Sequence, residues 1–95
     1  MYARITTYQV QQDKVDEMEA RLVGIKEQIK AISGVVSAHT AWRKDGHGVT
    51  TAIYESQQAA EAAGEKVQAI WASVGELLAA APSADGFDNV TDLLD

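Results

Sequence analysis

The chain has 95 residues, which is enough for one domain with a single hydrophobic core, so residues 1–95 are treated as one unit. Its 14 acidic and 8 basic residues give a formal net charge of −6, and without a basic patch this excludes nucleic acid as an expected partner. With no cysteine, the chain has no disulfide, no thiolate nucleophile and no thiolate metal site. It shows neither an export signal nor an apolar run near the roughly 20 residues that span a bilayer. We expect a cytoplasmic protein with no membrane partner.

The first half of the chain predicts a strand followed by a long helix. Residues 2–8 are rich in β-branched and aromatic side chains and contain no glycine or proline, as strands commonly do. A helix is expected from about Lys14, with Asp13 as its cap, to Ser33-Gly34. Its apolar residues recur in steps of three and four, which places them on one stripe. They are Val15, Met18, Leu22, Ile25, Ile29 and Ile32.

The middle of the chain predicts a hairpin. Residues 35–43 and 49–55 have strand-like composition, and Asp45-Gly46 between them suits a chain reversal because glycine tolerates positive φ.

A second helix and a last strand are expected after the hairpin. Ser56 is a suitable cap for the helix, and its apolar stripe runs from Ala60 to Leu77 at the same spacing. Gly64 predicts a kink or a split in this helix. Residues 82–86 are expected to form a turn, and residues 87–94 a short C-terminal strand.

This order of elements is the ferredoxin-like βαββαβ pattern of the α+β class. It predicts a four-stranded antiparallel sheet with two helices on one face. Neither set of alternating strand positions is purely polar, since Ile5 and Ile53 fall in one set and Tyr54 in the other. We therefore expect the second sheet face to contact another copy of the chain, in a homodimer.

The sequence resembles those of the dimeric α+β barrel superfamily, in particular its antibiotic-biosynthesis-monooxygenase-like branch. The likeness covers nearly the whole chain. It rests on the opening of residues 1–8, the end of the first helix at Ser33-Gly34-Val35, and the passage from Ile53-Tyr54-Glu55-Ser56 into Ala59-Ala60-Glu61-Ala62. The resemblance implies a homodimer whose sheets close a barrel, and a pocket between each sheet and its own helices.

The functions of that family range from cofactor-independent oxidation of aromatic polyketides and quinols to haem degradation. Haem-degrading members use an asparagine on the first strand with a tryptophan and a haem-ligating histidine on the helical side. This chain has Thr6 and Thr7 on its first strand and no histidine after His47, although Trp71 lies on the second helix. Haem degradation is therefore not expected, and we predict no cofactor.

The candidate catalytic residue is His39, which can serve as a general base for a phenolic substrate if it faces the pocket. The alternative is a strand histidine held by local hydrogen bonds, which is the reading that we favour. His47 follows the Asp45-Gly46 turn and is expected to be an exposed loop residue. Asp45 and His47 are two possible metal ligands without a third at usable spacing, so we predict no metal site.

The candidate binding residues are Trp42, Tyr54 and Trp71, which can stack on a planar ligand, and Arg4 on the first strand. Core or interface packing explains the three aromatic residues equally well. Arg4 is expected to form an ion pair between strands or subunits, with binding of a ligand carboxylate as the alternative.

Two functions follow from these residues. The first is a non-catalytic dimeric protein that binds a small planar or hydrophobic molecule between sheet and helices. The alternative is a cofactor-independent monooxygenase acting on a phenolic, quinol or polyketide-type substrate. Convergence of His39, Trp42, Tyr54 and Trp71 on one cavity would support the second.

Overall fold

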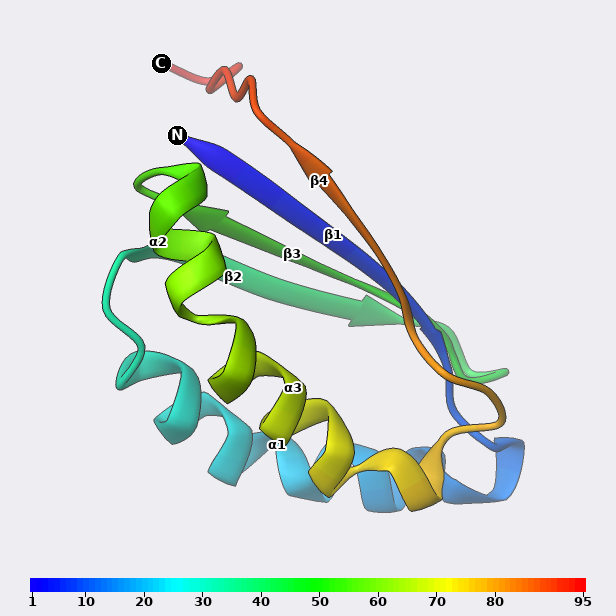
Figure 1. The fold of residues 1–95 in the computed structure, drawn as a ribbon. Coiled ribbons are helices and arrows are strands. Elements are labelled where there is room, and N and C mark those ends of the chain that lie inside the picture. The colour runs from blue at the N-terminus through cyan, green and yellow to red at the C-terminus, as the bar shows by residue number, and fades with distance from the viewer.

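The computed structural model describes residues 1–95 and shows an α+β fold with one antiparallel sheet (Figure 1). The strands are β1 (Tyr2–Gln9), β2 (Val35–Trp42), β3 (His47–Tyr54) and β4 (Ser83–Phe87). They lie in the order β2-β3-β1-β4, so the two ends of the chain meet in the β1–β4 pair. The helices all lie on one side of the sheet. The ferredoxin-like fold predicted from the sequence is confirmed.

The first helix begins slightly later than predicted. A 3₁₀ turn over Gln12–Lys14 precedes α1 (Val15–Lys30), and neither has a side-chain cap, so the expected capping role of Asp13 is wrong. No helix of the chain is long and apolar enough to cross a membrane.

The second helical segment is split as the glycine predicted. It consists of α2 (Gln57–Ala62), α3 (Gly64–Ser73) and a 3₁₀ turn, η2 (Gly75–Leu77). Ser56 caps α2, because its hydroxyl accepts a hydrogen bond from the Ala59 amide at 3.0 Å.

The predicted hairpin is confirmed, with its second strand beginning two residues earlier and ending one residue earlier than expected. Gly46 has a φ of +91°, which other residues rarely adopt, and the Asp45 carboxylate accepts from the His47 amide at 3.0 Å. His47 is exposed as expected, although it lies at the start of β3 and not in the loop.

The position predicted for the last strand is wrong. The segment predicted as a turn is β4 itself, in which Ser83 pairs with Thr7 and Phe87 with Ala3. Its Ala-Asp-Gly sequence has low strand propensity, so the sequence gives little sign of it. The segment is a strand because β1 offers it an unpaired edge.

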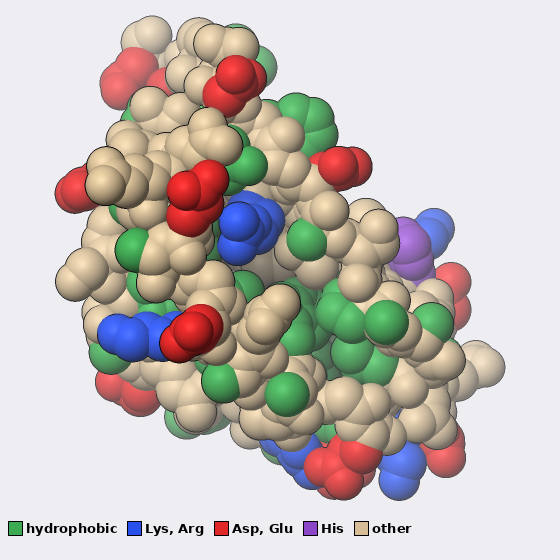
Figure 2. Space-filling view, in the orientation of Figure 1, with side chains coloured by type: hydrophobic (Ala, Val, Ile, Leu, Met, Phe, Trp, Pro, Cys, Tyr) green, Lys and Arg blue, Asp and Glu red, His purple; other side chains and the backbone are tan.

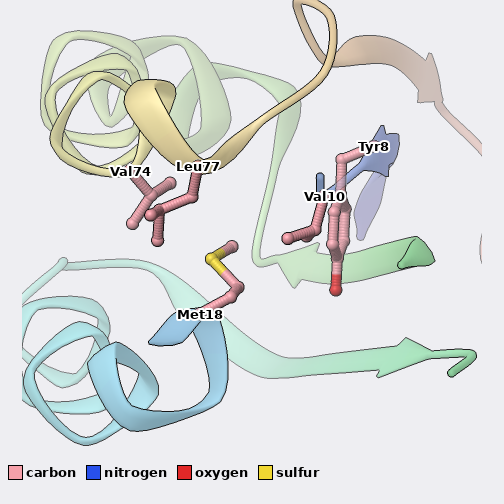
Figure 3. Packing of buried hydrophobic residues seen from close by; sticks show 5 residues of the cluster. All are labelled: Tyr8, Val10, Met18, Val74 and Leu77. Carbon is pink, nitrogen blue, oxygen red and sulfur yellow. The ribbon is translucent and has the colours of Figure 1, made fainter. Parts of the chain in front are cut away.

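The buried residues form two clusters at opposite ends of the space between sheet and helices. One, here called the Leu77 cluster, joins β1 to α1 and η2, and Figure 3 shows its side chains pointing toward one another. It consists of Tyr8, Val10, Met18, Val74 and Leu77. The other, the Tyr54 cluster, consists of Ile32, Tyr54, Ala60 and Ala63. Two alanines in the second cluster bring α2 close to the sheet, since a methyl group needs little room.

Candidate functional site

A cavity of about 550 Å³ lies between the sheet and the helices, and residues of both clusters contribute to its walls. Its lining comes from α1 and α3 on one side and from β1, β2 and β3 on the other. Fifteen of its 22 lining residues are hydrophobic. A volume within the range of small-molecule sites and an apolar lining suit a small, largely apolar molecule.

Three hydroxyl groups form a hydrogen-bonded set on the sheet wall of this cavity. Thr40 donates to the Val49 carbonyl at 3.3 Å and accepts from Thr50 at 3.1 Å. The Tyr8 hydroxyl lies 2.7 Å from Thr40 Oγ1. Because Thr40 has only one proton and donates it to a carbonyl, Tyr8 must be a donor to Thr40. The oxygen lone pairs of Tyr8 and Thr50 therefore stay available to a ligand that donates a hydrogen bond.

The position of Tyr8 depends on a glycine in the neighbouring strand. Tyr8 on β1 pairs with Gly48 on β3, and the Tyr8 ring lies where a side chain at Gly48 would be. The ring also contacts Trp71 of α3, with centroids 5.3 Å apart at an angle of 53°. Tyr8 and Trp71 thus form an aromatic corner of the cavity.

Arg4 supplies a positive charge to the cavity wall. It is half-buried and forms neither a hydrogen bond nor an ion pair within the chain, so the inter-strand ion pair predicted for it is absent. A guanidinium group without a carboxylate partner is available to an anionic group of a ligand.

Tyr54 lies beside this charge. The residue is only 2% exposed and lines the cavity, and its hydroxyl has no hydrogen-bond partner in the chain. Burial raises the pKa of the Tyr54 phenol above its ordinary value of 10.0, and the charge of Arg4 lowers that pKa in part. Tyr54 is therefore a neutral hydrogen-bond donor at neutral pH.

The structure brings together four of the five residues selected from the sequence. Arg4, Tyr54 and Trp71 line the cavity, and His39 borders it with an exposed side chain. The register pairs His39 with Thr51, whereas Thr40 pairs with Thr50. Because side chains alternate along a strand, the His39 side chain projects from the open face of the sheet, away from Thr40 and Thr50.

Trp42 does not line the cavity. It lies at the end of β2 opposite Gly48 and is 39% exposed.

The cavity hydroxyls Thr6, Thr40 and Thr50 were not selected from the sequence. The signal that could have found them is the hairpin register, which pairs Thr40 with Thr50 and Thr50 with Thr6 across three neighbouring strands. Threonine is common in strands for its shape alone, so composition does not separate these residues from others.

The sequence matches no protein-family model and no curated protein. Solved structures do match. A structure described as a putative antibiotic biosynthesis monooxygenase from Caulobacter crescentus has a TM-score of 0.80 and 23% identity, over 95% of this chain and 90% of that one. A protein from Mycobacterium tuberculosis has a TM-score of 0.76 and 21% identity, over 97% of each chain.

A monooxygenase from Streptomyces coelicolor, solved in complex with the ligand nanaomycin D, matches with a TM-score of 0.73 and 24% identity. The match covers 99% of this chain and 91% of that one. Identities at this level establish a shared fold and leave activity open. The chain therefore has the fold of the antibiotic-biosynthesis-monooxygenase-like proteins, as its sequence predicted.

Proposed function

We propose that the protein binds a small planar aromatic molecule bearing a hydroxyl or acidic group, in the cavity between sheet and helices. One observation carries this proposal: the sheet wall of a largely apolar cavity holds both hydrogen-bond acceptors and an arginine without a partner in the chain. The walls suit the ring system, the oxygens of Tyr8 and Thr50 suit a ligand hydroxyl, and Arg4 suits an oxyanion.

The two tryptophans allow a direct test of this proposal. In a Trp42→Phe variant the only indole is Trp71, which lies in the cavity wall. Titration with 2-naphthoate, a planar anion, is expected to quench its fluorescence to saturation. The Trp71→Phe variant keeps only the exposed Trp42 and is expected to show no saturable change.

A pair of alanine variants tests where the molecule binds. Ala52 lines the cavity, whereas Ala41 is exposed on β2 and does not. Ala52→Leu fills part of the cavity and is expected to weaken binding of 2-naphthoate at least tenfold. Ala41→Leu is expected to leave it unchanged, and equal effects of the two variants would contradict the proposed location.

The second candidate function is cofactor-independent oxidation of the bound phenol by dioxygen. It is favoured by the hydroxyl set and Arg4, which together can hold a phenol and stabilise its phenolate. The shared fold with a monooxygenase supports it further. In this reaction a phenol and one O₂ give a para-quinone and one water, in which the phenol proton and the para hydrogen leave, and the hydroxyl oxygens of Tyr8 and Thr50 are placed to accept a hydrogen bond from the phenol.

Oxygen uptake separates the two functions. With 1-naphthol as substrate, the oxygenase is expected to consume one O₂ for each quinone formed, and Arg4→Met is expected to slow the reaction because the phenolate loses its positive partner. Binding of 1-naphthol without oxygen uptake would leave ligand binding as the function.

We also propose that the chain forms a homodimer through the sheet face opposite the helices. In a single chain that face carries half-buried apolar side chains, among them Ile5, Val49 and Ile53, with no element covering them. Sedimentation at micromolar concentration is expected to show a dimer. Ile53→Arg is expected to give a monomer, whereas Val23→Arg, at an exposed position of α1, is expected to leave the dimer intact.

A further inference from the structure

The mouth of the cavity can be located from the exposure of its lining residues. Four of them are exposed, and these are Lys26, Lys30, Val36 and His39. All four come from α1 and β2, whereas the remaining lining residues are half-buried or buried. The cavity therefore opens between α1 and the β2 edge of the sheet.

The charged residues around this cavity are all basic. Arg4, Lys26 and Lys30 line it, and no aspartate or glutamate does. This is a strong local departure from a chain with 14 acidic and 8 basic residues. Lys26 forms no ion pair, and the 3.5 Å contact of Lys30 with Glu27 joins two well-exposed side chains, so it neutralises little.

A second hollow approaches Arg4 from the opposite edge of the sheet. This groove lies between the α2–α3 segment and β4, and it shares Arg4, Thr6, Val67 and Trp71 with the cavity. Only that row of side chains therefore separates the two spaces. In Figure 2 a basic side chain lies within a hollow that has acidic side chains on its rim.

The exposed charges of the groove are opposite to those of the cavity mouth. Its other charged lining residues are Glu61, Glu65 and Asp85, all exposed. Arg4 is thus reached through basic residues from one side and through acidic residues from the other.

We propose that the cavity selects anionic planar ligands, which enter between α1 and β2 past Lys26 and Lys30 and stop with their negative group at Arg4. This inference rests on the proposed function, because it requires that the cavity binds a planar molecule. The acidic groove behind Arg4 repels an anion and so makes entry one-sided. Exposed lysines add little to affinity, but a local positive potential raises the rate of association with an anion.

The experiment measures association rates by stopped-flow fluorescence of Trp71 in the Trp42→Phe background. The probes are 2-naphthoate and its neutral analogue 2-naphthamide. At low ionic strength the double variant Lys26→Gln/Lys30→Gln is expected to bind naphthoate about three- to tenfold more slowly. Its rate with naphthamide is expected to be unchanged. The naphthoate effect is expected to vanish at about 0.5 M salt, where the screening length is only a few ångströms.

Two further double variants provide the controls. Lys44→Gln/Lys66→Gln makes the same change in net charge at exposed residues outside both hollows, and is expected to change the naphthoate rate less than twofold. Glu61→Gln/Glu65→Gln removes acidic charge from the groove. If that variant raises the naphthoate rate by more than the Lys26/Lys30 variant lowers it, entry is through the groove and the inference is overturned.

The outcomes separate this inference from the function on which it rests. Saturable binding of both probes, with equal effects of the two lysine pairs, would overturn the inference and keep the proposed function. No Trp71 response to either probe would overturn both.

Discussion

The two faces of the sheet differ in where they keep their polar groups. The face beneath the helices carries hydroxyls in its middle, on Thr6, Thr40 and Thr50. The open face mixes apolar and polar side chains, since Ile5 pairs with Thr51 and Thr51 with His39 in its middle, while Val49 and Ile53 lie on either side of that row. An ordinary two-layer domain has an apolar inner face and a polar outer face, so both faces of this sheet depart in part from that pattern.

Both departures bear on function. The hydroxyls beneath the helices lie on the wall of the cavity, which residues of both clusters also line. Apolar groups on the open face suit contact with a second copy of the chain. Four measurements test this difference between the two faces.

The same substitution on the two faces should differ most in its effect on stability. Ile32 is buried in the Tyr54 cluster, and Ile32→Ala is expected to cost about 2–5 kcal/mol because it leaves a cavity. Ile53→Ala, on the open face, is expected to cost about 1 kcal/mol in the monomer, since the side chain is only half-buried there. Urea unfolding at submicromolar concentration measures both. Equal costs would contradict an open second face.

The glycine opposite Tyr8 should be nearly as sensitive. Gly48→Ala places a methyl group in the Tyr8 ring, so we expect a loss of about 1–3 kcal/mol and weaker binding of 2-naphthoate as the hydroxyl set is displaced. Gly24→Ala is the control, because its methyl group would meet nothing within 4 Å and α1 would gain about 0.5–1 kcal/mol. Thermal unfolding measures the change in stability of both variants. A stabilised Gly48→Ala variant would show that Tyr8 is free to move.

Removal of the cavity charge should affect binding more than folding. Arg4→Met is expected to weaken binding of 2-naphthoate about tenfold, since a charge-assisted hydrogen bond contributes about 1.5–3 kcal/mol. Binding of 2-naphthamide should change less than twofold. Arg43→Met, at an exposed position after β2, serves as the control. Calorimetric titration of the three proteins tests this, and equal losses for the two probes would exclude an anion site at Arg4.

The smallest expected effect is at alkaline pH. Because the pKa of Tyr54 is raised by burial, the folded state holds its phenol proton at a pH where the unfolded chain has lost it. Tyr54 therefore leaves stability unchanged below about pH 10 and lowers it as the pH rises further. Spectrophotometric titration should show a phenol that ionises above its ordinary pH range, and this signal should disappear in Tyr54→Phe. A titration curve that Tyr54→Phe leaves unchanged at its alkaline end would contradict this.

Most of the fold could be predicted because its signals are local. The three-and-four spacing of α1, the Asp45-Gly46 turn and the glycine that splits the second helix each act within a few residues. β4 was misplaced for the opposite reason. Its Ala-Asp-Gly sequence has low strand propensity, and the segment forms a strand by pairing with β1.

The candidate site was predicted in part. Arg4, Tyr54 and Trp71 stood out as large side chains in polar or strand contexts, and they do line one cavity. Trp42 looked similar in the sequence but lies at the far end of β2. A small hydroxyl such as that of Thr40 becomes informative only once its neighbours across the sheet are known.

The sequence by itself determined the order of the elements, the apolar stripes of the helices and the amphipathic character that requires two layers. These depend on periodicity and turn chemistry, which act over short distances along the chain. Only the tertiary structure decided the register that brings Tyr8 to Gly48 and Thr40 to Thr50, the edge that makes β4 a strand, and the opposite charges on the two approaches to Arg4. These depend on pairs of residues far apart in the chain, whose contacts are set by the packing of the whole domain.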